Sequence, residues 1–147
     1  MADLPTAVLF ACTMNSIRSP MAEGILKHLH GRQIYVDSVG VHAQEVSGFA
    51  VEVMAEIGID ISRHRAKSFR DLEDTSYDVV ISLSPEAQHS AVELTRTMAC
   101  ELEYWPTFDP SIASGSRDAR LEVFRRVRDE LMAHIKERFP VERPERA

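Results

Sequence analysis

The chain has 147 residues, of which 44% are hydrophobic and 27% are charged, and its 23 acidic against 17 basic side chains give a net charge of −6. A chain of this length typically forms one domain and buries roughly 68–70% of its unfolded surface without disulfides or a structural metal. The acidic balance, with no basic stripe, argues against nucleic acid or a membrane surface as partners. No apolar run approaches the ~20 residues that span a bilayer.

The N-terminus and the cysteines indicate a cytoplasmic protein. Asp3 stands where a signal peptide carries basic residues, so export is not expected. The two cysteines, Cys12 and Cys100, form neither a disulfide framework nor a zinc-binding pattern. We expect residues 1–147 to form a single domain, of which residues 140–147 are a charged, frayed tail.

Short apolar runs alternate with helical patterns from the start of the chain. The continuous apolar run 7–11 predicts a strand that is buried on both faces. A helix is expected over 20–30, because Ser19 can cap it, proline stands at its first position and Gly31 follows its end. Residues 34–38 predict a second strand.

The second half of the chain repeats this alternation. Apolar side chains at helical spacing predict a helix that ends at Gly58. A third strand is expected over 79–83, followed by a helix that opens at 84–86. The remaining elements are a weaker strand over 101–104 and a last helix from about 117 to 139.

This order predicts an α/β fold, in which a four-stranded parallel sheet is flanked by helices on both faces. Open parallel sheets bind ligands beyond the carboxyl ends of their strands. The first predicted strand ends at Ala11, so the loop that starts at Cys12 is the first candidate for a site.

The loop from Cys12 to Ser19 has the residues of an anion site. Its backbone N–H groups and the start of the next helix can converge on a phosphate dianion. The same field would stabilise a thiolate at Cys12, Arg18 offers a planar fork for two phosphoryl oxygens, and Ser19 can donate to the sulfur. The alternative to an anion site is that Cys12 is a buried packing residue and that Arg18 forms an ion pair on the surface. A cation at the start of a helix is, however, opposed by the helix dipole. The candidate phosphate-binding residues are Thr13, Met14, Asn15, Ser16, Ile17, Arg18 and Ser19.

These segments resemble a known family. The strand before Cys12, the loop to Arg18-Ser19-Pro20 and the following Met21-Ala22-Glu23 are similar to the opening of the low-molecular-weight protein tyrosine phosphatases and their arsenate-reductase relatives. The resemblance implies the four-stranded sheet and the use of no metal or other cofactor. It covers nearly the whole chain and continues, in order, through 38–40, 58–62, 64–66, 109–110 and 124–130.

The resemblance also implies a cysteine-dependent phosphatase, which acts on phosphotyrosine in a phosphorylated protein or on a similar small aryl phosphate and releases inorganic phosphate. Cys12 would attack phosphorus and form a phosphocysteine, while Arg18 and the loop N–H groups hold the phosphoryl oxygens. Asp109, which precedes Pro110, would protonate the leaving oxygen and then activate water. Read without the resemblance, Asp109 is equally an ordinary turn residue.

Ser38 and His64 match a pair that, in the family, supports the loop through an asparagine, here Asn15. Asn15 tolerates a left-handed backbone, which helps the loop to curl. His64 considered alone is also compatible with a surface or core histidine.

Three positions depart from the family pattern. Met14 replaces a glycine, so we expect a narrower cleft or a strained loop. Ile17 replaces a frequent second cysteine that can protect the nucleophile in a disulfide. Ser111 replaces a tyrosine that walls the phosphotyrosine cleft, and the loop 41–47, expected on the opposite side, is poor in aromatic residues.

Two alternatives to a phosphatase remain open. Thioredoxin-coupled arsenate reductases of this family need two further cysteines after the third strand, and the segment 82–90 has none. Cys100 lies beyond it and is expected to be a buried packing residue, so we favour the phosphatase. A phosphate-binding or partner-binding module with weakened catalysis is the other alternative, suggested by Met14 and Ser111.

Overall fold

The structure, a computed structural model, describes residues 4–73 and 76–141 of the chain. The tail expected over 140–147 lies outside the described residues from position 142 onward. The strands are β1 (Ala7–Cys12), β2 (Tyr35–Gly40), β3 (Val79–Ser82) and β4 (Glu101–Tyr104). The helices are α1 (Arg18–His30), α2 (Gly48–Ala55), α3 (Pro85–Leu94) and α4 (Arg117–Arg138), with short 3-10 turns η1 (Phe69–Asp71) and η2 (Pro110–Ile112).

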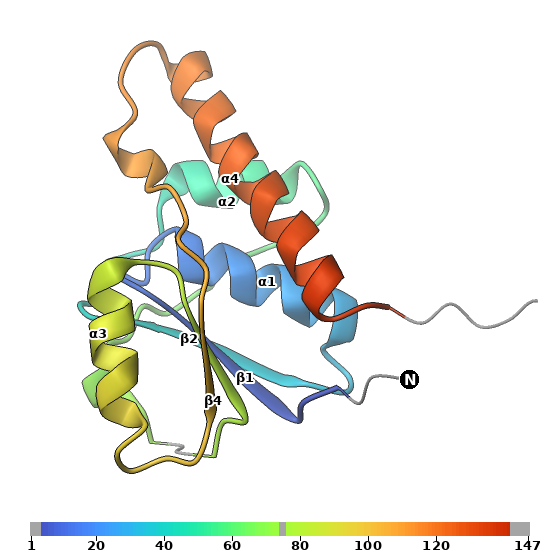
Figure 1. Cartoon of the computed structure of the whole chain (residues 1–147). Helices are drawn as coiled ribbons and strands as arrows, with labels where there is room; N and C mark the ends of the chain where they lie inside the picture. Colours follow the sequence, from blue (N-terminus) through green and yellow to red (C-terminus); the bar gives the residue numbers. More distant parts are fainter. Residues whose placement is uncertain (1–3, 74–75, 142–147) are drawn as a thin grey trace, which may run out of the picture.

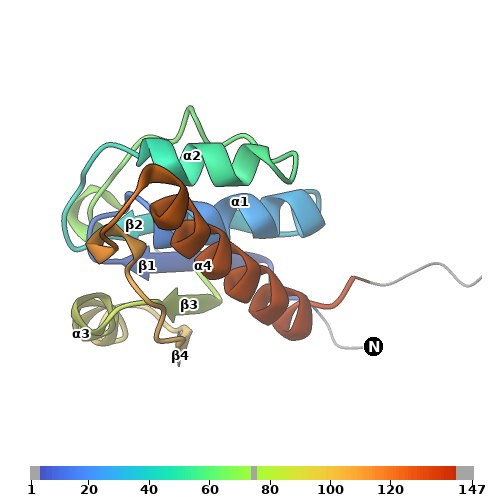
Figure 2. The ribbon, with the colours of Figure 1, turned by 90° about the horizontal axis from the view of Figure 1, so that it is seen from above.

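All four strands are parallel and follow the order β2-β1-β3-β4. The predicted α/β class and the parallel sheet flanked by helices are confirmed. Strand β1 is central, and its last residue, Cys12, lies opposite Gly40 of β2. The carboxyl ends of β1, β2 and β3 therefore meet at one edge of the sheet, where the η2 turn and the start of α4 also lie (Figure 2).

The alternation of side chains along β1 assigns each residue to one of two cores. Val8, Phe10 and Cys12 face a core that includes residues of α1, α2 and α4. The residues between them face a smaller core formed with α3, which lies on the other side of the sheet (Figure 1). Because the period of a strand is two, Cys12 must emerge on the α1 side.

Most helix and strand boundaries lie close to those predicted from the sequence, but the predicted cap of the first helix does not. Ser84 caps α3 by accepting a hydrogen bond from the N–H of Ala87 at 3.2 Å. Gly58 has a φ of 78°, although α2 itself already ends at Ala55. The prediction that Ser19 caps the first helix is wrong, because α1 begins at Arg18 and the buried Ser19 hydroxyl is used by the loop instead.

Helix α4 covers the larger core with the apolar stripe that the sequence predicts. Its five stripe residues are all buried. The buried stripe consists of Leu121, Phe124, Val127, Leu131 and Ile135.

Among the described residues, no helix is long and apolar enough to cross a membrane.

Gly40, the last residue of β2, packs directly against the segment that follows β1. A β-carbon there would lie 2.6 Å from the backbone nitrogen of Asn15 and closer still to the carbonyl oxygen of His42. Backbone atoms cannot turn aside as a flexible side chain does, so Gly40→Ala should lower the free energy of unfolding by about 1–3 kcal/mol. Urea unfolding measures this, with Gly48→Ala as the control because nothing lies within 4 Å of a β-carbon at Gly48. Equal stability of the two variants would contradict the close approach.

Candidate active site

The segment between β1 and α1 turns its carbonyl groups outward. The carbonyl oxygens of residues 12, 13, 14 and 16 accept hydrogen bonds of 2.8–3.1 Å from backbone N–H groups of the segment 41–47. Within residues 4–73 and 76–141, no backbone carbonyl accepts a hydrogen bond from the N–H groups of residues 13–19. These N–H groups and the N-terminus of α1 therefore line a concave site suited to an anion. We call residues 12–19 the anion loop.

Asn15 holds the anion loop in its curled form. It is fully buried and has a φ of 52°, the one positive φ of a non-glycine residue in the described chain. Its Nδ2 donates to the hydroxyls of Ser19 at 2.8 Å and Ser38 at 3.0 Å. Its Oδ1 accepts from the backbone N–H of Lys67 at 3.0 Å and lies 2.9 Å from His64 Nε2. The four hydrogen bonds use the whole capacity of the amide.

This network also fixes where its protons lie. Since the backbone N–H of Lys67 can only donate, the amide atom that it contacts is the oxygen. His64 Nε2 must then carry the hydrogen that it shares with Asn15. Ser38 accepts from Asn15 and donates its own proton to Glu23 Oε1 at 2.5 Å. Both predicted supporting residues, Ser38 and His64, thus bond to Asn15.

Glu23 is a member of this network that sequence reasoning missed as a functional residue. Its carboxylate is buried, accepts from Ser38, and lies 3.8 Å from His64 Nδ1. Lys27, one turn further along α1, pairs with its other oxygen. The available signal was its position among the buried residues of α1, where an acid needs partners.

Cys12 is the first residue of the anion loop and lies beside the start of α1. Its Sγ atom is 2.9 Å from the Ser19 hydroxyl oxygen, and the cysteine is 2% exposed. Because that hydroxyl already accepts from Asn15, its own proton is free to point at the sulfur or at the carbonyl of Val39, 3.3 Å away. A thiolate at Cys12 would take this proton as a hydrogen bond.

Arg18 spans the space between the anion loop and the loop that follows β4. The buried guanidinium donates to the carbonyl oxygen of Thr107 at 3.1 Å and lies 3.5 Å from the hydroxyl of Thr13. Its Nη2 atom is 3.9 Å from Asp109 Oδ2. Arginine and aspartate are therefore neighbours, although 91 positions separate 18 from 109 in the sequence.

The loop after β4 delivers Asp109 to this edge of the sheet. Trp105 anchors the loop, because it is buried, stacks on His134 at 3.7 Å and meets Phe10 edge to face. Asp109 caps the η2 turn by accepting from the N–H of Ser111 at 3.0 Å. Its second oxygen stays on the Arg18 side, and its side chain is 39% exposed. Solvent and a bound molecule can both reach this carboxylate.

The loops enclose a cleft of about 290 Å³ beside Cys12. The segment 41–47 lines one side, as predicted, through Gln44, Glu45 and Ser47. Met14 also lines the cleft. Of the two effects expected from Met14, a narrower cleft or a strained loop, backbone strain is not found at this residue, because the positive φ of the loop belongs to its neighbour Asn15.

An aromatic wall of this cleft was not predicted from the sequence. Phe49 of α2 and Phe124 of α4 line it and meet edge to face with ring centroids 5.3 Å apart. Ser111, in place of the expected tyrosine, lines the cleft as well. The aromatic surface therefore comes from the two helices and not from the loops flanking Cys12.

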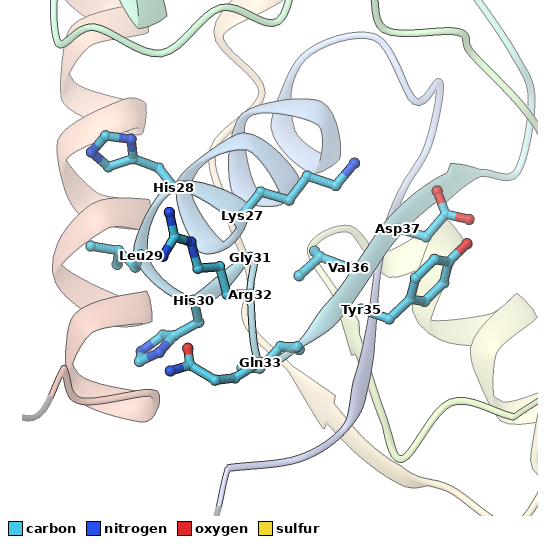
Figure 3. A pocket seen from close by; sticks show the side chains of 11 residues that line it. Lys27, His28, Leu29, His30, Gly31, Arg32, Gln33, Tyr35, Val36 and Asp37 are labelled. Carbon is cyan, nitrogen blue, oxygen red and sulfur yellow. The ribbon is translucent and has the colours of Figure 1, made fainter.

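A larger depression of about 750 Å³ lies at the other end of α1 (Figure 3). Three of its polar side chains are already engaged with other parts of the fold. His30 bonds to the carbonyl oxygen of Phe139 at 2.7 Å, Lys27 pairs with Glu23, and Asp37 pairs with Lys67. Its place at the negative end of the helix dipole is also unfavourable for an anion.

Comparisons with known proteins show the family and the fold of the chain. Residues 7–139 match the family described as low molecular weight phosphotyrosine protein phosphatase. An arsenate reductase of Shouchella clausii is 39% identical over 130 residues, which cover 88% of this chain and 91% of that protein.

Two solved structures are also similar. A low molecular weight protein tyrosine phosphatase from T. tengcongensis has a TM-score of 0.74 and 34% identity over 90% of this chain and 96% of the other. An arsenate reductase in the phosphate binding state has a TM-score of 0.71 and 34% identity, over 90% of this chain and 95% of the other.

The buried network makes the stability of the fold sensitive to the protonation of His64. Burial lowers the pKa of His64 below its ordinary 6.5, an effect that Glu23 opposes and Lys67 reinforces. In the unfolded chain a histidine binds its proton near pH 6.5. Below that pH the unfolded state therefore holds more protons than the folded state, and the free energy of unfolding decreases as the pH falls towards the lower, folded pKa.

His64→Gln should flatten this decrease by up to about 1.4 kcal/mol per pH unit, because glutamine keeps a donor for Asn15 but does not titrate. Denaturant unfolding between pH 7 and pH 5 measures the slope. His28→Gln, which removes an exposed histidine, is the matched control. A slope for His64→Gln equal to that of the unmodified protein would contradict the assignment.

Proposed function

The chain belongs to the low molecular weight phosphotyrosine protein phosphatase family, and we propose that it hydrolyses phosphotyrosine, or a similar aryl phosphomonoester, through a phosphocysteine intermediate. One observation carries the proposal. The Cys12 sulfur stands at a loop whose carbonyl groups are held outward and whose N–H groups remain for an anion. A dianionic phosphoryl group and an anionic sulfur both need such an environment.

In the first proposed step, the Cys12 thiolate attacks phosphorus and the bond from phosphorus to the aryl oxygen breaks. Arg18 and the anion-loop N–H groups hold the phosphoryl oxygens as charge shifts between them. Asp109, protonated, gives its proton to the leaving oxygen, which departs as a neutral phenol. The Ser19 hydroxyl, 2.9 Å from the sulfur, stabilises the thiolate before the attack.

In the second step, water attacks the phosphocysteine. The Asp109 carboxylate takes a proton from this water as the new bond to phosphorus forms and the bond to sulfur breaks. The products are inorganic phosphate and the Cys12 thiolate, with Asp109 protonated again. The exposure of the Asp109 side chain supports this step, because water must reach it.

Arsenate reduction is the second candidate, because an arsenate reductase is 39% identical to the chain. Reduction of arsenate to arsenite takes two electrons, which a disulfide relay draws from further thiols. Cys100 is the one other cysteine of the chain. It directly precedes β4, whose first residue pairs with Val79, whereas Cys12 ends β1 at the opposite edge of the sheet. Two cysteines so placed cannot form a disulfide unless the sheet opens.

Turnover assays separate these candidates. We expect the protein to release phosphate from p-nitrophenyl phosphate, with vanadate as an inhibitor, and Cys12→Ser to lose this activity. Cys100→Ser is the matched control and should retain it, because Cys100 is half-buried against the smaller core. Arsenate-dependent oxidation of a reduced thioredoxin or glutathione system without phosphate release would support the reductase. Binding of phosphate without either turnover would indicate a module with weakened catalysis.

Asp109→Asn tests the proposed acid. A phenol leaves with a pKa of about 10, so turnover of phosphotyrosine should fall about 10²–10³-fold while KM changes little. The loss should shrink for p-nitrophenyl phosphate, whose leaving group is already acidic, provided that phosphorylation of Cys12 limits the rate. Asp118→Asn, an exposed carboxylate at the start of α4, is the control. The same loss for every leaving group, or no loss, would leave Asp109 as a turn residue only.

A further inference from the structure

The cleft contains an arginine that the proposed phosphoryl transfer does not use. Arg120 of α4 lines the cleft together with Arg18 and is half-buried. Its guanidinium carbon lies 4.7 Å from the centroid of the Phe49 ring. Among the described residues, the guanidinium of Arg120 has no hydrogen-bond or ion-pair partner, although its backbone N–H donates to Ser116 within the helix. A half-buried cation with only an aromatic ring beside it retains five N–H donors for a bound molecule.

Two neighbouring arginines of α4 are paired with carboxylates of α2 and its C-cap, whereas the half-buried Arg120 is not. Arg117, one turn earlier, pairs with Glu52. Arg125, further along, pairs with Glu56 at 2.9 Å. The position of Arg120 near the N-terminus of α4 is also unfavourable for a cation, because the helix dipole is positive there. Neither an ion pair nor the dipole explains its orientation into the cleft.

We propose that Arg120 and Phe49 form a leaving-group subsite that selects small aryl phosphates bearing a carboxylate on the ring. The inference rests on the proposed function, since it assigns the part of the substrate that leaves. With the phosphoryl group in the anion loop, the ring of the substrate extends along the apolar side of the cleft, which Phe49 and Phe124 line. The guanidinium then binds the ring carboxylate as a planar fork. The cleft of about 290 Å³ accommodates a ring with one substituent.

Two carboxylates of the cleft bear on this selectivity. Asp109 is directed towards Arg18, 3.9 Å away, and carries the proton in the proposed first step. Glu45 is exposed on the segment 41–47, and its backbone carbonyl accepts a hydrogen bond from Ser16 at 2.9 Å. If the negative charge of Glu45 determined the selectivity instead, cationic leaving groups would be preferred. The aminomethyl compound in the experiment below tests this outcome.

Binding of non-hydrolysable phosphonates tests the subsite without turnover. Calorimetry on the full chain compares benzylphosphonate with its 3-carboxy, 4-carboxy, 4-carboxamide and 4-aminomethyl derivatives. We expect one of the two carboxylates to bind about tenfold more tightly than benzylphosphonate and the carboxamide, because hydrogen bonds to a charged partner exceed those to a neutral one. The aminomethyl compound should bind no better than benzylphosphonate.

Arg120→Gln should remove the preference for the carboxylate while leaving the affinity for benzylphosphonate within about twofold. Arg117→Gln is the matched control, because Arg117 also contacts the Phe49 ring, at 5.8 Å, but is paired with Glu52. This variant should keep the preference. Equal affinities for the carboxylates and the carboxamide in the unmodified protein, tightest binding of the aminomethyl compound, or loss of the preference in both variants would overturn the proposal.

The corresponding aryl phosphates separate failure of the subsite from failure of the proposed function. Hydrolysis of phenyl phosphate and its 4-carboxy derivative at equal kcat/KM, together with equal phosphonate affinities, would reject the subsite and keep the phosphatase. Selective binding of the carboxylated phosphonate with no hydrolysis of any aryl phosphate would keep the subsite and reject the phosphatase.

Discussion

The four hydrogen bonds of the Asn15 side chain are the constraint on which the site depends. One of them closes the anion loop on itself at Ser19, and the others join it to Ser38 of β2 and to the segment of His64 and Lys67. Since the amide is buried and fully bonded, displacing any one partner would leave a polar atom unsatisfied, at a cost of about 1–3 kcal/mol. Asn15 can therefore keep a positive φ, and the loop keeps its N–H groups aligned before any anion arrives.

Two elements far apart in the sequence complete the site around this loop. Side chains alternate between the two faces of β1, and this alternation places Cys12 on the face covered by α1. The sulfur therefore lies at the N-terminus of α1 and not in the smaller core formed with α3. The buried Trp105 fixes the loop after β4 and so carries Asp109 to Arg18. The proposed chemistry follows from this convergence, because one edge of the sheet brings together a sulfur, a cation and a carboxylate. Among the described residues, the same edge holds no second cysteine, so no other thiol of this chain lies beside Cys12 there.

Periodicity was sufficient to predict the four strands and the parallel sheet, because buried strands and amphipathic helices leave strong local patterns. The hydrogen bonds of Ser38 and His64 to Asn15 could be expected from the resemblance to a family. The role of Arg120 could not, since it depends on which side chains meet across elements, and for Glu23 the one signal was an acid placed among the buried residues of α1. Ser19 was misread for the same reason: its hydroxyl bonds across the loop, and no local signal distinguishes that from a helix cap.

In the proposed mechanism, Cys12 carries the phosphoryl group between the two steps. The most direct measurement is a rapid acid quench of the protein during turnover of a radiolabelled aryl phosphate, followed by isolation of the tryptic peptide 1–18. That peptide contains Cys12 and no other cysteine. We expect label on the Cys12 sulfur at a level that rises before phosphate is released. Release of phosphate with no label on Cys12 at any time would contradict it.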